Sequence, residues 1–169
     1  GIAIIAILTG LNTLERPGRP KEEPNDLIIQ TTCRLLIPII QLFALYVLAH
    51  GHYSPGGGFQ GGVILGASFI LYALAYDLKS TLKRYSIKGA MTIAVIGVLF
   101  YAAHGIFAMV QEGNFLDYTK LDSILPGDAI MARYHSMLGV EIGVLLTVSS
   151  IMFAIYANLA SRGGLTKGM

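Results

Sequence analysis

Long apolar stretches alternate with short polar ones along most of this chain. After residue 26, apolar segments occupy residues 27–49, 61–76, 89–111 and 135–159. A helix rises about 1.5 Å per residue, so the first, third and fourth can cross a hydrocarbon layer of about 30 Å. The second reaches that length only if it takes in Phe59 and Gln60, or Asp77 and Leu78. The pattern predicts an all-α integral membrane protein with four transmembrane helices.

The first 26 residues differ from the rest. Residues 1–11 are apolar, but they are too few to span a bilayer and lack the small-residue cleavage site of a signal peptide. We expect either an interfacial segment or a truncated fifth transmembrane helix. Residues 13–26 combine three prolines with many charges, which predicts an extended connector. The expected divisions are therefore residues 1–26, a membrane domain at 27–159 and a tail at 160–169.

Composition supports the membrane assignment. Hydrophobic residues make up 54% of the chain and charged residues only 13%, whereas a soluble domain is about a quarter charged. The single Cys33 excludes an internal disulfide and a multi-cysteine metal site, and it is best interpreted as a small buried apolar residue. The net charge of +2, with no dense basic patch, gives no reason to expect nucleic-acid binding.

The distribution of Lys and Arg predicts the orientation. If alternate connections lie on alternate sides, nine of these residues fall on one side and two on the other. The basic side is expected to be cytoplasmic. Both ends of the 27–159 domain are therefore predicted in the cytoplasm, with the loops at 50–60 and 112–134 outside. The nine are Arg16, Arg19, Lys21, Lys79, Lys83, Arg84, Lys88, Arg162 and Lys167.

Two charged residues lie inside predicted spans, where each costs at least about 2.5–3.5 kcal/mol. Arg34 is seven residues into the first helix, and two interpretations stay equally open: its side chain extends to the cytoplasmic interface, or it contacts another subunit. Glu141 is six residues into the fourth helix, and its shorter side chain cannot reach water so easily. Glu141 must be protonated, paired, or directed towards water or another chain.

His104, in the outer half of the third helix, is the expected neighbour of Glu141 by depth. We therefore hypothesise that Glu141 and His104 belong to a proton or cation path that opens to the outside. His50, His52 and His135 also lie towards the outside, but we interpret them as residues at the hydrated ends of helices. The sequence predicts no metal site, because the histidines are too few and unsuitably spaced for three or four ligands.

The glycine-rich stretch HGHYSPGGGFQGG, residues 50–62, is not a phosphate-binding loop, since it lacks both the preceding strand and the GK[ST] ending. Gly58, Gly62 and Gly66 continue into the second helix at a spacing of four. A stripe of small residues lets two helices approach closely, so these three are candidate packing contacts, including contacts with another subunit.

Residues 26–159 resemble the MnhB (MrpB) family of small membrane subunits from multisubunit Mrp-type Na⁺/H⁺ antiporters. Relatives of the family occur in membrane-bound hydrogenases and sulfur-reducing complexes. The resemblance rests on the motif H-x-x-PGGGF-x-GG and on GVEIGVLLTV at residues 139–148. The motif residues are His52, Pro55, Gly56, Gly57, Gly58, Phe59, Gly61 and Gly62.

The resemblance implies a non-enzymatic subunit without a cofactor, located in the cell membrane among the other subunits of a complex that moves Na⁺ and H⁺. It transfers no catalytic residue, so the hypothesis for Glu141 and His104 rests on physical grounds alone. One alternative is a structural adapter in a membrane-bound hydrogenase or a related redox-driven pump. A free-standing channel is a weaker alternative, because four helices with a glycine stripe look incomplete alone.

Overall fold

The computed structural model describes residues 27–51, 56–111, 113–118 and 129–161. Within these ranges the chain forms four long helices, α2 (Leu27–Ala49), α3 (Gly58–Tyr76), α5 (Ile87–Val110) and α6 (Ala129–Ala160), together with the short helix α4 (Leu78–Arg84). Each long helix contains a stretch long and apolar enough to cross a membrane. The prediction of an all-α protein with four membrane spans is confirmed. The expectations for residues 1–26 lie outside the described ranges.

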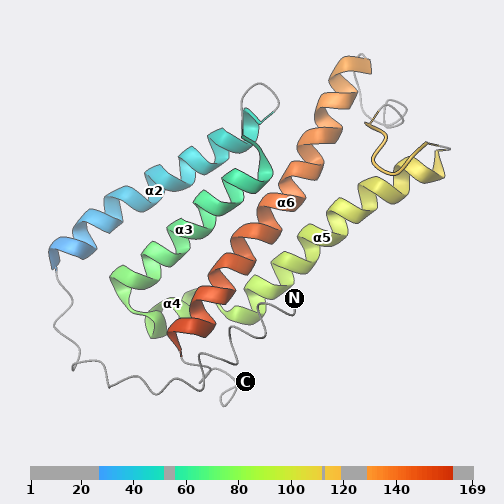
Figure 1. Cartoon of the computed structure of the whole chain (residues 1–169). Coiled ribbons are helices and arrows are strands. Elements are labelled where there is room, and N and C mark those ends of the chain that lie inside the picture. Colours follow the sequence, from blue (N-terminus) through green and yellow to red (C-terminus); the bar gives the residue numbers. More distant parts are fainter. Residues whose placement is uncertain (1–26, 52–55, 112, 119–128, 162–169) are drawn as a thin grey trace.

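The four long helices lie side by side in the order α2, α3, α6, α5 (Figure 1). The central pair, α3 and α6, runs parallel, because Gly58, Gly62 and Gly66 meet Glu141, Leu145 and Ser149 in turn. The outer helices run antiparallel to their neighbours. The loop between α2 and α3 and the start of α6 therefore lie at the same end of the molecule, and α4 lies at the opposite end (Figure 1).

The helix boundaries agree with the sequence prediction in α2 and differ elsewhere. Helix α3 begins at Gly58, so it reaches spanning length by taking in Phe59 and Gln60. Helix α6 begins at Ala129, six residues before the predicted start, because its first turns extend beyond the apolar stretch that hydropathy detects. The sequence did not predict helix α4, because a polar segment of seven residues is too short to show the hydrophobic periodicity of a helix.

Small residues bring the helices together. A Cβ on Gly62 would lie 3.0 Å from the carbonyl oxygen of Leu145, and one on Gly66 would lie 3.2 Å from that of Ser149. Between α5 and α6, a Cβ on Gly97 would lie 2.6 Å from the carbonyl oxygen of Gly143. Such backbone-to-backbone approach is the close packing that small residues permit in membranes. The glycine stripe of α3 is thus occupied by α6 of the same chain.

Candidate functional site

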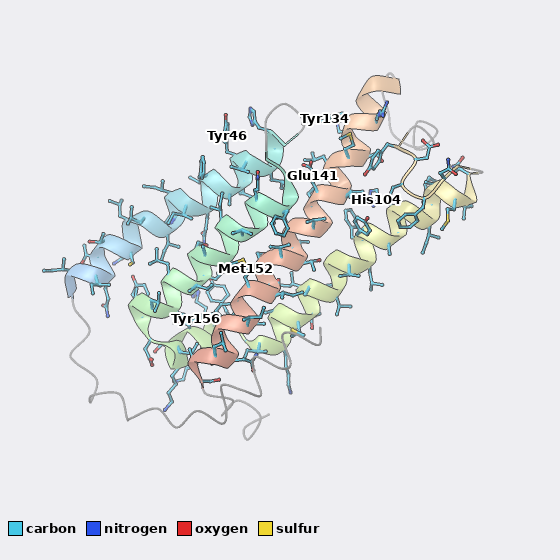
Figure 2. All side chains as sticks on the ribbon, in the orientation of Figure 1. Tyr46, His104, Tyr134, Glu141, Met152 and Tyr156 are labelled. Carbon is cyan, nitrogen blue, oxygen red and sulfur yellow. The ribbon has the colours of Figure 1, made fainter. Side chains whose placement is uncertain are left out.

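Glu141 lies on α6 within the apolar span Arg133–Ala160. It is the only Asp or Glu in the four candidate spans and is half-buried. Figure 2 shows it on the upper part of α6, near the connection between α2 and α3. An acidic side chain at this depth is costly, which makes its surroundings the first place to look for function.

Three glycines surround Glu141. A Cβ on Gly51 would lie 2.7 Å from Oε2 of Glu141, and a Cβ on Gly57 would lie 3.0 Å from Oε1. A Cβ on Gly58 would overlap the carbonyl oxygen of Glu141 itself. The end of α2 and the start of α3 therefore close around the glutamate with bare backbone. We call Gly51, Gly57, Gly58 and Glu141 the glycine niche.

The first turn of α3 gives the niche its electrostatic character. Gly57 is the N-cap of α3 and has no side chain to satisfy the free amides of that turn. The positive end of the helix dipole therefore lies beside the carboxylate, and the two attract each other. No hydrogen bond or ion pair joins the Glu141 carboxylate to another residue of the described ranges.

Tyr118, in the connection between α5 and α6, also lies within electrostatic reach of the niche. Burial raises the pKa of the Tyr118 phenol, and the neighbouring Tyr101 phenol and Glu141 carboxylate raise it further. The Tyr101 ring packs on Phe115 with a centroid separation of 6.3 Å, and Phe115 in turn contacts Gly105. The described part of this connection, residues 113–118, thus folds back over the C-terminal half of α5.

His104 does not meet Glu141. Its Nδ1 donates a hydrogen bond to the carbonyl oxygen of Phe100 at 2.9 Å, which directs Nε2 towards α6. There the ring contacts Gly139, whose added Cβ would lie 2.6 Å from Nε2. Residues 139 and 141 point to different faces of α6, so His104 lies on the α5 side and Glu141 on the α3 side (Figure 2). The structure does not bring together the pair that depth alone suggested.

Arg34 lies exposed on α2, near the opposite end of the layer from Glu141. Within the described residues it forms no ion pair. Cys33 beside it is 6% exposed and packs with Ile37 and Ala75 between α2 and α3, as expected for a small apolar residue. Arg34 therefore points away from the helix contacts of its own chain.

The remaining motif residues divide between packing and exposure. Gly61 packs on α2, where a Cβ would lie 2.9 Å from the carbonyl oxygen of Ala44. Phe59 is 64% exposed and does not contribute to the interior. His52 and Pro55 lie outside the described residues. Gly58, Gly62 and Gly66 pack inside the chain, so of the predicted subunit-contact residues only Arg34 faces outwards.

Sequence reasoning did not connect the glycine motif with Glu141, and it did not single out Gly51, Gly97, Gly139 or Gly143. One available signal was depth, because the loop at 50–60 and the first half of the last helix were both expected on the outer side. A second was the glycine spacing of four in the last helix at Gly139 and Gly143, which repeats the pattern of α3.

Comparison with known proteins agrees with this architecture. A family model described as a domain related to the MnhB subunit of Na⁺/H⁺ antiporter matches residues 28–154. A Bacillus subtilis (strain 168) protein, the B subunit of a Na⁺/H⁺ antiporter, is 39% identical over 144 residues, which cover 84% of this chain and 98% of that protein. A Staphylococcus aureus (strain Newman) protein named for antiporter subunit mnhB2 is 30% identical over 80% of this chain and 95% of that protein.

A solved structure shares the fold. A chain of the membrane-bound sulfane sulfur reductase, an archaeal respiratory membrane complex, superposes with a TM-score of 0.65. The match covers 93% of the present chain and 68% of the other, at 23% sequence identity. At that identity the likeness concerns the arrangement of the helices.

Proposed function

The chain belongs to the MnhB family of Na⁺/H⁺ antiporter subunits, and on that premise we propose that it is a small membrane subunit of a multisubunit cation (Na⁺)/H⁺ antiporter. Its partners are other membrane subunits of the same complex. The subunit contributes to ion movement through Glu141 rather than through a chemical reaction. The observation that carries the proposal is the glycine niche, in which bare glycine backbone lies against the single acidic residue of the four candidate spans.

The niche suits an ion-handling carboxylate for two reasons. No described side chain neutralises Glu141, so its charge is free to respond to a proton or a cation. Because Gly51 and Gly57 have no side chains, they leave space beside both carboxylate oxygens of Glu141. Ionisable groups retained at membrane depth generally mark ion or proton pathways, and transporter sites are often formed where helices are interrupted near such a group.

His104 has a separate role in this proposal. It faces Gly139 of α6 rather than the niche, so it cannot exchange a proton with Glu141 directly. We propose that His104 is a second polar group in the outer half of the bundle. An ion path would reach it without a direct proton exchange with Glu141. A variant of His104 should therefore affect transport differently from a variant of Glu141.

We also propose the orientation that the basic residues indicate. The end of the layer with Lys79, Lys83, Arg84 and Lys88 faces the cytoplasm, together with both ends of the 27–159 domain. The glycine niche then opens towards the outside of the cell membrane. Arg34, in the cytoplasmic half of α2, is the residue we assign to contact with a neighbouring subunit.

The test is the variant Glu141→Gln in the assembled complex, assayed as Na⁺- or H⁺-driven antiport in membrane vesicles. Loss of the charge should reduce antiport by at least about tenfold, which corresponds to a barrier change of about 1.4 kcal/mol, while the complex stays assembled on a native gel. Asp77→Asn is the matched control. It makes the same chemical change at an exposed carboxylate, and Asn serves as well as Asp at the N-cap position of a helix.

Two other outcomes would redirect the proposal. Unchanged antiport in an intact Glu141→Gln complex would remove Glu141 from the ion path. Dissociation of the complex would favour the alternative function, a structural adapter, in which the niche serves only to hold subunits together. Identification of the proteins that co-purify in mild detergent would separate an antiporter from a redox-driven setting.

A further inference from the structure

Helix α4 joins two membrane-spanning helices without leaving the membrane surface. It follows the end of α3 at Tyr76 by one residue and precedes the start of α5 at Ile87 by two. It packs mainly on α3, and Figure 1 shows it at the end of the layer beside the start of α5. Because both neighbours enter the bilayer here, α4 lies at the level of the lipid headgroups.

The exposed face of this region is basic. Thr81 is completely buried and its hydroxyl donates to the carbonyl oxygen of Asp77 at 2.8 Å, which fixes one side of α4 towards the bundle. The exposed side of α4 carries three basic residues, Lys79, Lys83 and Arg84, and Lys88 is exposed in the first turn of α5. None of these four forms an ion pair with another described residue. The only acidic residue in this part of the described chain is Asp77, whose carboxylate accepts the backbone amide of Lys79 at 3.3 Å.

One tyrosine, Tyr85, lies beside this basic surface, and ring contacts link it to Tyr72 and Tyr76, which pack on the Cys33 cluster. The Tyr72 ring lies 4.7 Å from that of Tyr76 and 5.9 Å from that of Tyr85. The Arg84 guanidinium carbon lies 6.0 Å from the centroid of Tyr85. Tyrosine prefers the boundary between headgroups and hydrocarbon, where its ring is in lipid and its hydroxyl is in water.

Apolar surface suited to acyl chains adjoins the basic residues. Leu74, on the last turns of α3, is 63% exposed, and Met91, on the first turns of α5, is 49% exposed. A ligand that covers this region must therefore combine negative charge with a hydrocarbon part. An acidic soluble protein would satisfy the lysines and leave Leu74 and Met91 uncovered.

We propose that Lys79, Lys83, Arg84 and Lys88 form a binding site for anionic phospholipids of the leaflet in which α4 lies. The basic groups bind headgroup phosphates, Tyr85 lies at the glycerol level, and the acyl chains lie along α3 and α5. Each basic residue near a bilayer surface strengthens attraction to anionic lipid by about fivefold. The site is independent of the glycine niche, which lies at the other end of the helices.

The experiment uses the purified complex in phosphatidylcholine vesicles that contain a minor fraction of photoactivatable phosphatidylglycerol as the anionic lipid. After illumination, crosslinked peptides are mapped by mass spectrometry. We expect crosslinks in residues 74–91, and a decrease of about tenfold or more in Lys79→Gln/Lys83→Gln. Arg133→Gln removes the same type of charge from an exposed position at the other end of α6 and should leave these crosslinks unchanged.

The outcomes separate lipid binding from its alternatives. Equal crosslinking by a photoactivatable phosphatidylcholine would overturn the proposal, because attraction would not depend on headgroup charge. Crosslinks confined to another subunit would overturn it too, by showing that protein covers α4. If the double Gln variant fails to assemble, Lys79→Arg/Lys83→Arg retains the charge and should crosslink like wild type, while 1 M salt should weaken the wild-type signal.

Discussion

Gly57 faces the Glu141 carboxylate and also has a backbone conformation that favours glycine. Its φ of 126° is rarely adopted by other residues, and the three atoms nearest to a Cβ there would all belong to the Glu141 side chain. We expect Gly57→Ala to destabilise the chain by about 1–3 kcal/mol, the cost of a strained backbone conformation. Thermal unfolding of the complex measures the change.

Gly56 provides the control for this prediction. It belongs to the same motif, but its Cβ would meet Val47 Cγ1 at 3.3 Å and the Val47 carbonyl oxygen at 3.4 Å, so a small adjustment accommodates it. Gly56→Ala should therefore change stability by less than about 1 kcal/mol. Equal destabilisation by the two variants would contradict the special role of Gly57 in the niche.

Tyr118 reports on the charge at Glu141. Its pKa is raised mainly by burial, with Tyr101 and Glu141 adding to the rise. Above about pH 10 an unfolded tyrosine ionises while this one keeps its proton, so the free energy of unfolding should fall as pH rises there and be unaffected at lower pH. Absorbance titration, with Tyr118→Phe to identify the signal, should show a lower Tyr118 pKa in Glu141→Gln. If the Tyr118 pKa were unchanged in Glu141→Gln, the Glu141 charge would not act on the Tyr118 phenol.

The sequence identified Glu141 and the glycine motif separately, and the reason lies in how the residues are connected. A charge inside an apolar segment is visible from local sequence, and so is a run of glycines. Their association depends on the register between α3 and α6, which places Gly58 against a residue far along the chain. No local pattern determines that register. The predicted pairing with His104 was based on depth alone and ignored which face of α6 each residue occupies.

At the level of elements, the packing of α3 on α6 should be sensitive to a single methyl group. A Cβ on Gly62 would lie 2.9 Å from the Cβ of Val148 and 3.0 Å from the Leu145 carbonyl oxygen, so the helices would have to separate. We expect Gly62→Ala to cost about 1–3 kcal/mol, as overpacking usually does. Unfolding in detergent, followed by circular dichroism, measures the loss.

Gly89 supplies the comparison on α5. A Cβ there would approach only the Ser86 hydroxyl, at 3.1 Å, and Gly89 is exposed. Alanine favours a helix over glycine by about 1 kcal/mol, so Gly89→Ala should be neutral or stabilising. If Gly62→Ala behaved in the same way, the close approach of α3 and α6 would not be what stabilises this pair.

Helices with long apolar segments could be predicted from the sequence, whereas short or polar helical segments could not. Helix α2 was predicted with its observed bounds because its apolar run begins after a proline-containing connector and ends at a polar loop. The early start of α6 and the whole of α4 were missed, since both lie where hydropathy falls at the membrane surface. Their helical form there depends on contacts with neighbouring elements, such as the burial of Thr81.

The molecule as a whole is a single layer of helices with large apolar side chains exposed on both outer members. On α2 these include Leu35 (70% exposed) and Leu42 (68%), and on α5 they include Leu99 (62%) and Val110 (75%). Lipid or other membrane subunits must cover this surface, because apolar area of this extent is not stable in water. The sequence predicted the four spans, whereas their side-by-side order required knowledge of which small residues face each other.

The orientation of this layer can be tested with two cysteine variants and a membrane-impermeant maleimide. Ser80, on α4, and Asn114, after α5, are both exposed and lie at opposite ends of the layer. Ser80→Cys should react only in inverted membrane vesicles, and Asn114→Cys should react in intact cells, because the basic end is expected in the cytoplasm. Cys33 is buried between α2 and α3, so the parent chain should contribute little background. The reverse labelling pattern would place the glycine niche on the cytoplasmic side and would require the ion path to enter from there.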